Sequence, residues 1–187
     1  TFASTRILLN SLTPEQILLY RSLIALVLLL LLARPRLVWR SVKTELLYLI
    51  AVVCGITLYF IFENVALLYT YSSNAALLVT ASPLFTVLIA SFVFKTQAFN
   101  QRILVACLLA LFGVGMVLAN QSLSLSQGLF GNLLALLAGL VWAFYNVAME
   151  KVDDALSPIL RTQKVFFYGI ITTAVYMLVT GKHFVNQ

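Results

Sequence analysis

The chain has 187 residues, of which 62% are hydrophobic and 10% are charged, and its mean hydropathy is +1.02. Soluble domains are closer to one half apolar, so this composition excludes an ordinary soluble fold and indicates a membrane protein. The net charge of +6 is explained below by the loops that carry it, and it gives no reason to expect nucleic acid as a partner.

Six apolar runs are long enough to form transmembrane helices, because a hydrocarbon core about 30 Å thick needs roughly 20 residues per helix. An apolar stub at residues 1–11 precedes them, and we interpret it as the end of a spanning helix whose start the sequence lacks. Uniform runs such as "LLALLAGLVWAF" do not fit the alternating strands of a membrane barrel. The six runs are residues 14–33, 46–71, 74–94, 103–119, 128–149 and 158–180.

The loops between these runs differ in charge. One set of alternate loops holds nine cations, whereas the other set holds only Lys182. Because cationic loops stay in the cytoplasm, the start of the 14–33 run, the "YTYSSN" turn and the "NQSLSLSQG" loop are predicted to lie outside. The nine cations are Arg34, Arg36, Arg40, Lys43, Lys95, Arg102, Lys151, Arg161 and Lys164.

Two runs begin with the same signal, "LTPEQILLYR" at 12–21 and "LSPILRTQKV" at 156–165. Each has a hydroxyl residue suited to an N-cap, followed by a proline suited to the first helical position. The predicted topology places the first start outside and the second in the cytoplasm. A repeat with an odd number of spans returns inverted, as in many secondary transporters, although a chance recurrence of a common helix start is the alternative.

Glu63 and Asn64 interrupt the apolar run 46–71. At 1.5 Å per residue, Glu63 lies about 12 Å from the outer end of its helix and Arg21 about 10 Å from the outer end of its own. Arg6 lies at a similar level if its helix ends shortly after residue 10. Because a lone charge inside a membrane costs about 2.5–3.5 kcal/mol on insertion scales, we expect Glu63 and Arg21 to face the bundle interior and each other.

Two interpretations of this pair are open. In the functional one, Glu63 binds a substrate amine or a proton in a cavity, and Arg21 sets its ionisation. In the structural one, the pair only fixes one helix against the next. The face that contains Glu63 is predicted from helical spacing to hold mostly small, polar or amphipathic side chains, namely Val52, Gly55, Tyr59, Glu63, Ala66 and Thr70.

Pro83 lies in the middle of the run 74–94. It lacks an N–H and frees the carbonyl of Val79, so we expect the helix to bend and this acceptor to find another partner. A packing kink is the simpler interpretation, although a bend also serves a rocking motion. The partner, a neighbouring helix or a cavity, is expected at a small-residue face formed by Ala76, Thr80, Pro83, Val87 and Ala90.

The run 128–149 contains two pairs of small residues at a spacing of four, Gly131/Ala135 and Gly139/Ala143, which predict close helix contacts. Trp142 lies inside the span rather than in the interfacial belt. With Tyr145 and Asn146 it either packs between helices or walls a cavity for a polar or cationic solute, and we favour the cavity. The expected face comprises Gly131, Ala135, Ala138, Trp142, Tyr145 and Met149. In the run 103–119, Gly113 and Gly115 are expected to serve packing.

The residues that usually carry covalent chemistry are sparse. Cys54 and Cys107 have no paired spacing and no neighbouring His, so we interpret them as packing residues rather than as a metal site or a disulfide. The single His183 lies in a terminal loop. The sequence has no glycine-rich phosphate loop and no nucleophile with a base at helical spacing, so neither an enzyme nor a cofactor is expected.

Four stretches resemble EamA-type members of the drug/metabolite transporter superfamily, over about residues 12–151. The second is the most specific, because a short polar turn, "SSNAALL" and the "SPLFT" proline follow the order and spacing of that family. The turn "KTQAFNQ" departs from it, since the family usually has an acidic residue there. The four stretches are "LTPEQILLYRSLIALVLLLLLA", "ENVALLYTYSSNAALLVTASPLFTVLIASFVF", "LLALFGVGMVLA" and "LLALLAGLVWAFYNVAMEK".

The resemblance implies ten helices in two inverted five-helix repeats, a substrate cavity between the halves, and cytoplasmic termini. On that scheme the chain holds the end of helix 1 through helix 7. Residues 1–119 would be the first repeat, without the start of helix 1, and residues 120–187 the first two helices of the second. An arginine at the position of Arg21 is frequent in the family, which favours the structural interpretation for that residue.

We therefore predict an all-α polytopic protein of the inner (plasma) membrane. It is expected to be a secondary transporter that moves small organic metabolites, amino-acid-like solutes or drugs, through the lipid bilayer by alternating access, with protons as a candidate coupling ion. A non-transporting scaffold or assembly subunit, or a pore, would show the same hydropathy. The predicted substrate pathway comprises Glu63, Arg21, Tyr59, Asn64, Thr80, Trp142, Tyr145 and Asn146.

Overall fold

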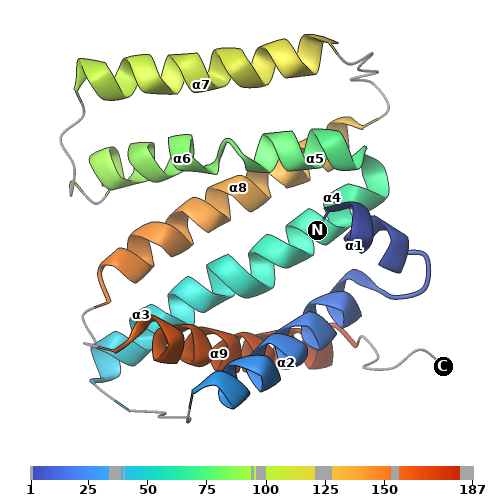
Figure 1. The fold of residues 1–187 in the computed structure, drawn as a ribbon, viewed down its shortest axis with the longest axis vertical. Helices are drawn as coiled ribbons and strands as arrows, with labels where there is room; N and C mark the ends of the chain where they lie inside the picture. The colour runs from blue at the N-terminus through green and yellow to red at the C-terminus, as the bar shows by residue number, and fades with distance from the viewer. Residues whose placement is uncertain are drawn as a thin grey trace.

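The computed structural model describes residues 2–33, 39, 41–93, 95, 100–120, 128–152 and 156–181, without the side chains of residues 111 and 114–120. This part of the chain is a bundle of helices (Figure 1). In chain order they are α1 (Phe2–Leu8), α2 (Pro14–Leu32), α3 (Val42–Val52), the π-helical segment η1 (Val53–Leu58), α4 (Tyr59–Tyr69), α5 (Ser72–Val79), α6 (Ser82–Leu88), the π-helical segment η2 (Ile89–Val93), α7 (Gln101–Asn120), α8 (Leu129–Glu150) and α9 (Pro158–Val179).

Five spans in the described part are long and apolar enough to cross a membrane. The segments α3, η1 and α4 form one of them, a 28-residue helix. The remaining predicted run, 103–119, forms α7, and the stub at 1–11 contains α1. The prediction of an all-α polytopic membrane protein is confirmed. The five spans are Pro14–Leu32, Val42–Tyr69, Ser72–Val93, Leu129–Glu150 and Pro158–Val179.

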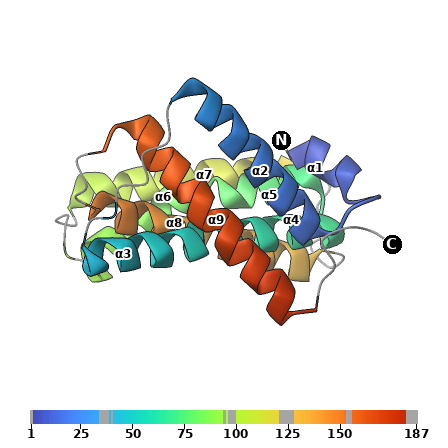
Figure 2. The same cartoon turned by 90° about the horizontal axis from the view of Figure 1, so that it is seen from below.

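The helices stack side by side, with α8 between two groups. On one side α8 packs against α5 and α6, and on the other it packs against α3, η1 and α4. Helix α7 lies beyond α5 and α6 at one edge of the bundle (Figure 1). Helices α2 and α9 pack against each other and cover the opposite edge (Figure 2).

The two helix starts predicted from hydroxyl and proline residues are both present. Before α2, the Thr13 hydroxyl accepts from the Gln16 backbone N–H at 3.4 Å, and the Gln16 side chain accepts from the Thr13 backbone N–H at 3.0 Å. Before α9, the Ser157 hydroxyl accepts from the Leu160 backbone N–H at 3.5 Å. Such caps satisfy N–H groups that the first helical turn leaves without intrahelical acceptors.

Helices α2 and α9 begin at opposite ends of the bundle and run antiparallel (Figure 1). Gln163 of α9 joins them, because its side-chain amide donates to the carbonyl oxygens of Leu29 at 2.8 Å and Ala33 at 2.9 Å. These carbonyls lie at the C-terminal end of α2, where Leu29 O also accepts from the Ala33 backbone N–H at 3.1 Å but no further turn of helix supplies a donor to Ala33 O. The last turn of α2 is thus capped by a side chain from α9.

The closest helix contact involves α4 and α8. A Cβ atom added to Gly131 would lie 2.9 Å from the Ala66 carbonyl oxygen and 2.9 Å from the Thr70 backbone nitrogen. Backbone atoms cannot give way as a flexible side chain can, so any larger residue here pushes the helices apart. The close contact predicted for Gly131 is confirmed, and the small partners Ala135 and Ala143 are both 0% exposed.

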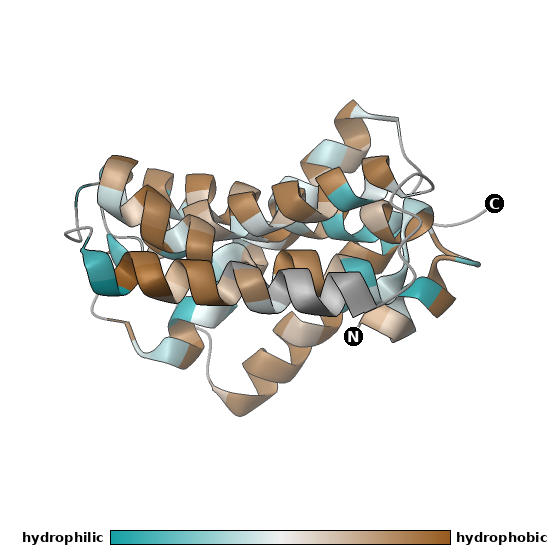
Figure 3. Ribbon diagram, turned by 90° about the horizontal axis from the view of Figure 1, so that it is seen from above, coloured by the Kyte–Doolittle hydropathy of each residue, from teal (hydrophilic) through white to brown (hydrophobic). Residues whose placement is uncertain are grey.

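The lateral surface of the bundle is apolar. Figure 3 shows hydrophobic colour along most helices and hydrophilic colour near several helix ends. Large aliphatic side chains such as Leu31 (79% exposed) and Val179 (80% exposed) point away from the described core. Exposed aliphatic faces of this extent suit contact with lipid.

The cations on which the predicted topology rests, the nine assigned to the cytoplasm and Lys182 assigned to the outside, divide into three groups. Lys43, Lys95, Arg102 and Lys151 are exposed; Lys95 and Lys151 lie outside the helices, whereas Lys43 and Arg102 are the second residues of α3 and α7, at the helix ends. Arg34, Arg36, Arg40 and Lys182, like His183, lie outside the described residues. The assignment of Arg161 and Lys164 to a loop is wrong, because both belong to α9. Lys164 is only 3% exposed, since α9 begins six residues before it.

Candidate functional site

Glu63 and Asn64 lie inside the bundle, each 2% exposed. The Asn64 side-chain amide donates to the Pro14 carbonyl oxygen at 3.0 Å, which ties α4 to the start of α2. Among the described residues, neither Glu63 Oε2 nor Asn64 Oδ1 has a hydrogen-bond partner. The inward orientation expected for Glu63 is present, and consecutive residues of α4 each bury an unsatisfied acceptor oxygen inside the bundle.

Arg21 does not pair with Glu63 as the sequence suggested. Its side chain is exposed, its guanidinium carbon lies 4.5 Å from the centroid of the Phe60 ring, and no ion pair with Glu63 occurs in the described part of the chain. The prediction used only the number of residues from each helix end, which estimates the depth of a side chain. It does not give the direction in which the side chain points around its helix. Arg21 instead borders a cavity of about 580 Å³ between α1 and α2, whose lining does not include Glu63.

Arg6 lies at a different level from the one predicted. It donates from Nη1 to the carbonyl oxygen of Thr70 at 2.8 Å, at the very end of α4. Glu63 is seven residues earlier on that helix, about 10 Å away along the axis. The expected single layer of three charges is therefore wrong.

Three aromatic rings from two helices stack beside Glu63. The Trp142 ring centroid lies 4.8 Å from that of Tyr59 and 4.9 Å from that of Tyr145. Tyr59 is one turn before Glu63 on α4, and its hydroxyl interacts with the Glu63 carboxylate. All three rings are half-buried, as is Asn146, and the group reaches Glu63 through Tyr59.

Gly55 makes room for this stack. A Cβ atom at Gly55 would collide with the ring carbons of Tyr145. Gly55 lies in the π-helical segment η1, and π-helical turns inside α-helices often occur at functional sites. The absence of a side chain at this position lets the Tyr145 ring lie directly on the backbone of η1.

The span 74–94 is interrupted rather than bent. Helix α5 ends at Val79 and α6 begins at Ser82, with Pro83 in its first turn. The Val79 carbonyl faces α8, 3.5 Å from where a Cβ atom of Gly139 would lie. The predicted small-residue face is only partly inward, because Thr80 and Pro83 are exposed and Ala76 and Val87 are half-buried, whereas Ala90 is buried in the core. Thr80 is exposed, and its hydroxyl donates to the Leu77 carbonyl oxygen of α5.

A buried ion pair that sequence reasoning missed joins α3 to α9. Lys164 Nζ lies 2.7 Å from Glu45 Oε1, and the two side chains are 4% and 6% exposed. The Tyr168 hydroxyl donates to Glu45 Oε2 at 2.7 Å, and the ammonium lies 4.5 Å from the Tyr48 ring centroid. The signal was the position of Lys164, about 9 Å inside an apolar helix, where a charge needs a partner.

The two predicted packing cysteines are free and half-buried. No three His, Cys, Asp or Glu side chains gather into a metal-binding group among the residues whose placement is described. Gly113 differs from the expectation of a packing role, since nothing lies within 4 Å of its added Cβ.

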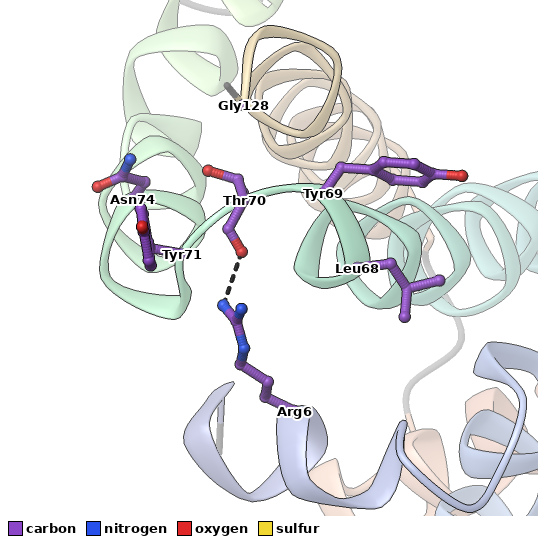
Figure 4. A pocket seen from close by; sticks show the side chains of 7 residues that line it. All are labelled: Arg6, Leu68, Tyr69, Thr70, Tyr71, Asn74 and Gly128. Carbon is purple, nitrogen blue, oxygen red and sulfur yellow. Dashed lines mark hydrogen bonds between the residues drawn. The ribbon is translucent and has the colours of Figure 1, made fainter. Parts of the chain in front are cut away.

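A second, smaller cavity of about 180 Å³ lies where α4 turns into α5 (Figure 4). The guanidinium of Arg6 reaches up to the Thr70 carbonyl at this point, and Tyr71 and Asn74 extend from the start of α5. The full lining comprises Arg6, Leu68, Tyr69, Thr70, Tyr71, Asn74 and Gly128.

Comparison with known proteins identifies the family. The model of the "EamA-like transporter family" matches residues 1–119. An "uncharacterized transporter" of Archaeoglobus fulgidus is 29% identical over 191 residues, which cover 97% of this chain and 63% of the relative. One of Clostridium kluyveri is 29% identical over 121 residues, 63% of this chain and 39% of the relative.

The chain thus spans less than two thirds of the length of these curated relatives. No solved structure gave a significant match. The family match covers well over half of the 187 residues, and the helical spans agree with it. The chain belongs to the EamA-like transporter family.

Proposed function

We propose that this chain is the membrane-embedded part of a secondary transporter that moves small organic solutes by alternating access, with Glu63 at the centre of the pathway. One observation carries the proposal. Glu63 and Asn64 are consecutive buried residues, and Glu63 Oε2 and Asn64 Oδ1 have no hydrogen-bond partner in the described chain. Buried acceptors without donors are unfavourable, so such a site is suited to a ligand or a proton that supplies them.

The chemistry of the site favours a solute that carries hydrogen-bond donors. Both unsatisfied atoms are acceptors, and one belongs to a carboxylate, so an ammonium group fits better than an anion. The faces of Trp142 and Tyr59 add a surface that attracts cations and packs against apolar groups. Amines, amino-acid-like solutes and cationic drugs have this combination, and a proton on Glu63 would occupy the same acceptor between transport cycles.

The fold supplies places where the backbone can bend. The span Ser72–Val93 is broken between α5 and α6, and η1 interrupts the regular helix just before Tyr59. The opposite entry of α2 and α9 supports a division into a first repeat at 1–119 and the beginning of an inverted second repeat at 120–187. Rocking of one repeat against the other, in the inner membrane, would expose Glu63 to each side in turn.

Glu63→Gln should reduce uptake of cationic and zwitterionic solutes into proteoliposomes by about tenfold to a hundredfold, the effect of losing one charge-assisted hydrogen bond. The full-length protein is assayed over an amino-acid and drug panel, with and without a pH gradient. Glu150→Gln is the matched control, because Glu150 is exposed at the end of α8. It removes the same charge and should leave the fluxes unchanged.

Unchanged flux and unchanged gradient dependence in Glu63→Gln would rule out a pathway through this residue. Accessibility separates a transporter from a scaffold. A cysteine placed at position 63, in a chain whose Cys54 and Cys107 are replaced, should react with a water-soluble thiol reagent and be protected by substrate. A cysteine that stays unreactive in every condition would indicate a purely structural bundle.

A further inference from the structure

The small cavity at the α4–α5 turn is lined mainly by polar residues, and the charge in its wall is that of a cation. Arg6, from α1, is the only Asp, Glu, Lys, Arg or His among the residues that line it. The remaining polar groups belong to residues 69–71 and to Asn74 (Figure 4). No carboxylate belongs to the lining, so the one formal charge in the cavity wall is positive.

Arg6 has hydrogen-bond donors to spare. A guanidinium carries five N–H donors in a planar fork, and the one hydrogen bond that Arg6 makes within the described chain is to the Thr70 carbonyl oxygen. Its guanidinium carbon also lies 5.9 Å from the Tyr71 ring centroid. The contact with Thr70 fixes the guanidinium at the cavity and leaves the other donors available for a ligand.

Asn74 supplies an independent observation. It is 6% exposed and lines the cavity, yet its side-chain amide has no hydrogen-bond partner in the described part of the chain. It stands in the first turn of α5, a helix of eight residues whose start has no side-chain cap. The backbone N–H groups of that turn lack intrahelical acceptors and carry a partial positive charge.

We propose that this cavity binds an oxyanion group, a carboxylate or a phosphate, between Arg6 and the first turn of α5. The cation supplies the charge and a planar fork of donors that matches such groups, and the Asn74 amide supplies a further donor. A volume of about 180 Å³ has room for such a group, because a water molecule occupies about 30 Å³ in the liquid.

This site is separate from Glu63. About 10 Å of α4 separates Glu63 from Thr70, which is further apart than the amine and the carboxylate of one amino acid. A zwitterionic solute would therefore meet the two sites in sequence, Arg6 by its carboxylate and Glu63 by its amine. This order of events rests on the proposed function, whereas oxyanion binding itself does not.

The test is equilibrium binding to the full-length protein in phosphatidylcholine nanodiscs, measured by calorimetry without any flux. Acetate and inorganic phosphate should bind, whereas acetamide, which has the size of acetate but no charge, should not. Arg6→Gln should weaken acetate binding by about tenfold to a hundredfold, because Gln keeps one donor for Thr70 but loses the charge. Arg102→Gln, at an exposed cation of α7, should leave binding unchanged.

A second arm identifies the source of the oxyanion. Replacing part of the phosphatidylcholine by phosphatidylglycerol, with no soluble anion present, should raise the melting temperature in an Arg6-dependent way if a lipid phosphate occupies the cavity, and acetate then adds little. If acetate binds and phosphatidylglycerol has no Arg6-dependent effect, the ligand comes from water. Either result supports the site.

Equal responses of wild type and Arg6→Gln in both arms, or equal binding of acetate and acetamide, would overturn the proposal. Asn74→Leu provides a second variant on a different helix, and it should weaken acetate binding severalfold without changing the net charge. Glu63→Gln should bind acetate normally, so failure of the transport proposal and failure of the oxyanion site give different results.

Discussion

Replacing Lys164 by methionine should lower the free energy of unfolding by about 3–5 kcal/mol, the usual effect of removing one partner of a buried ion pair. Glu45 would then lose the ammonium group that lies 2.7 Å from its Oε1, while the Tyr168 hydroxyl would still donate to its Oε2. The measurement is unfolding in mixed detergent micelles, followed by helical circular dichroism. The loss should be large because both side chains are almost fully excluded from solvent.

The double variant Glu45→Gln/Lys164→Met separates the stranded charge from the lost packing. The glutamine introduced at position 45 is neutral but still accepts a hydrogen bond from Tyr168, so the double variant should recover more than half of the stability that the single variant loses. A double variant no more stable than Lys164→Met would show that the ion pair is not the source of the effect.

Gly131→Leu should be the most damaging single change on α8, with a loss of about 3 kcal/mol. The added side chain meets the backbone of α4 at Ala66 and Thr70, and backbone cannot move aside without separating the two helices. It also disturbs the neighbouring hydrogen bond from the Thr70 hydroxyl to the Asn132 side-chain oxygen, 2.7 Å long. The same unfolding assay measures the loss.

Gly113→Leu is the matched control for Gly131→Leu. Nothing lies within 4 Å of an added Cβ at Gly113, and leucine is a better helix former than glycine by up to about 1 kcal/mol. This variant should be as stable as the wild type or slightly more so. Equal losses at Gly113 and Gly131 would mean that the effect comes from glycine itself and not from the close approach of α4 and α8.

The features that were predictable from the sequence depend on one segment at a time. The helical spans follow from the length of each apolar run, and the starts at Thr13 and Ser157 follow from local capping chemistry. The inward orientation of Glu63 follows from the free-energy cost of a charge in lipid. Gly131 was recognisable because its spacing from Ala135 is a property of a single helix.

What was missed depends on how separate helices are turned toward one another. Glu45 and Lys164 are 119 residues apart in the chain. The sequence around either residue does not predict that the other is its partner. Arg21 and Glu63 were expected to face each other, but the directions of their side chains around α2 and α4 are set by packing that a residue count does not contain.

The span that contains Pro83 shows a second reason for error. A helical wheel drawn through residues 74–94 assumes one continuous helix, whereas Thr80 and Ala81 lie between α5 and α6. Faces before and after such a break are out of phase, so Thr80 was assigned to the interior although it is exposed. That the helix is irregular near Pro83 was predictable from proline chemistry, but the interruption and its change of phase were not.

The amide of Gln163 limits how α9 can move. It donates to two carbonyl oxygens at once. Pulling the helices apart there would strand the amide and the Ala33 carbonyl oxygen, at a cost of about 1–3 kcal/mol for each unsatisfied group, whereas the Leu29 carbonyl oxygen would keep its hydrogen bond from the Ala33 backbone N–H. The ends that meet at Ala33 are thereby held as a pivot, so that separation of this helix pair opens first at its far end, near Thr13 and Thr180.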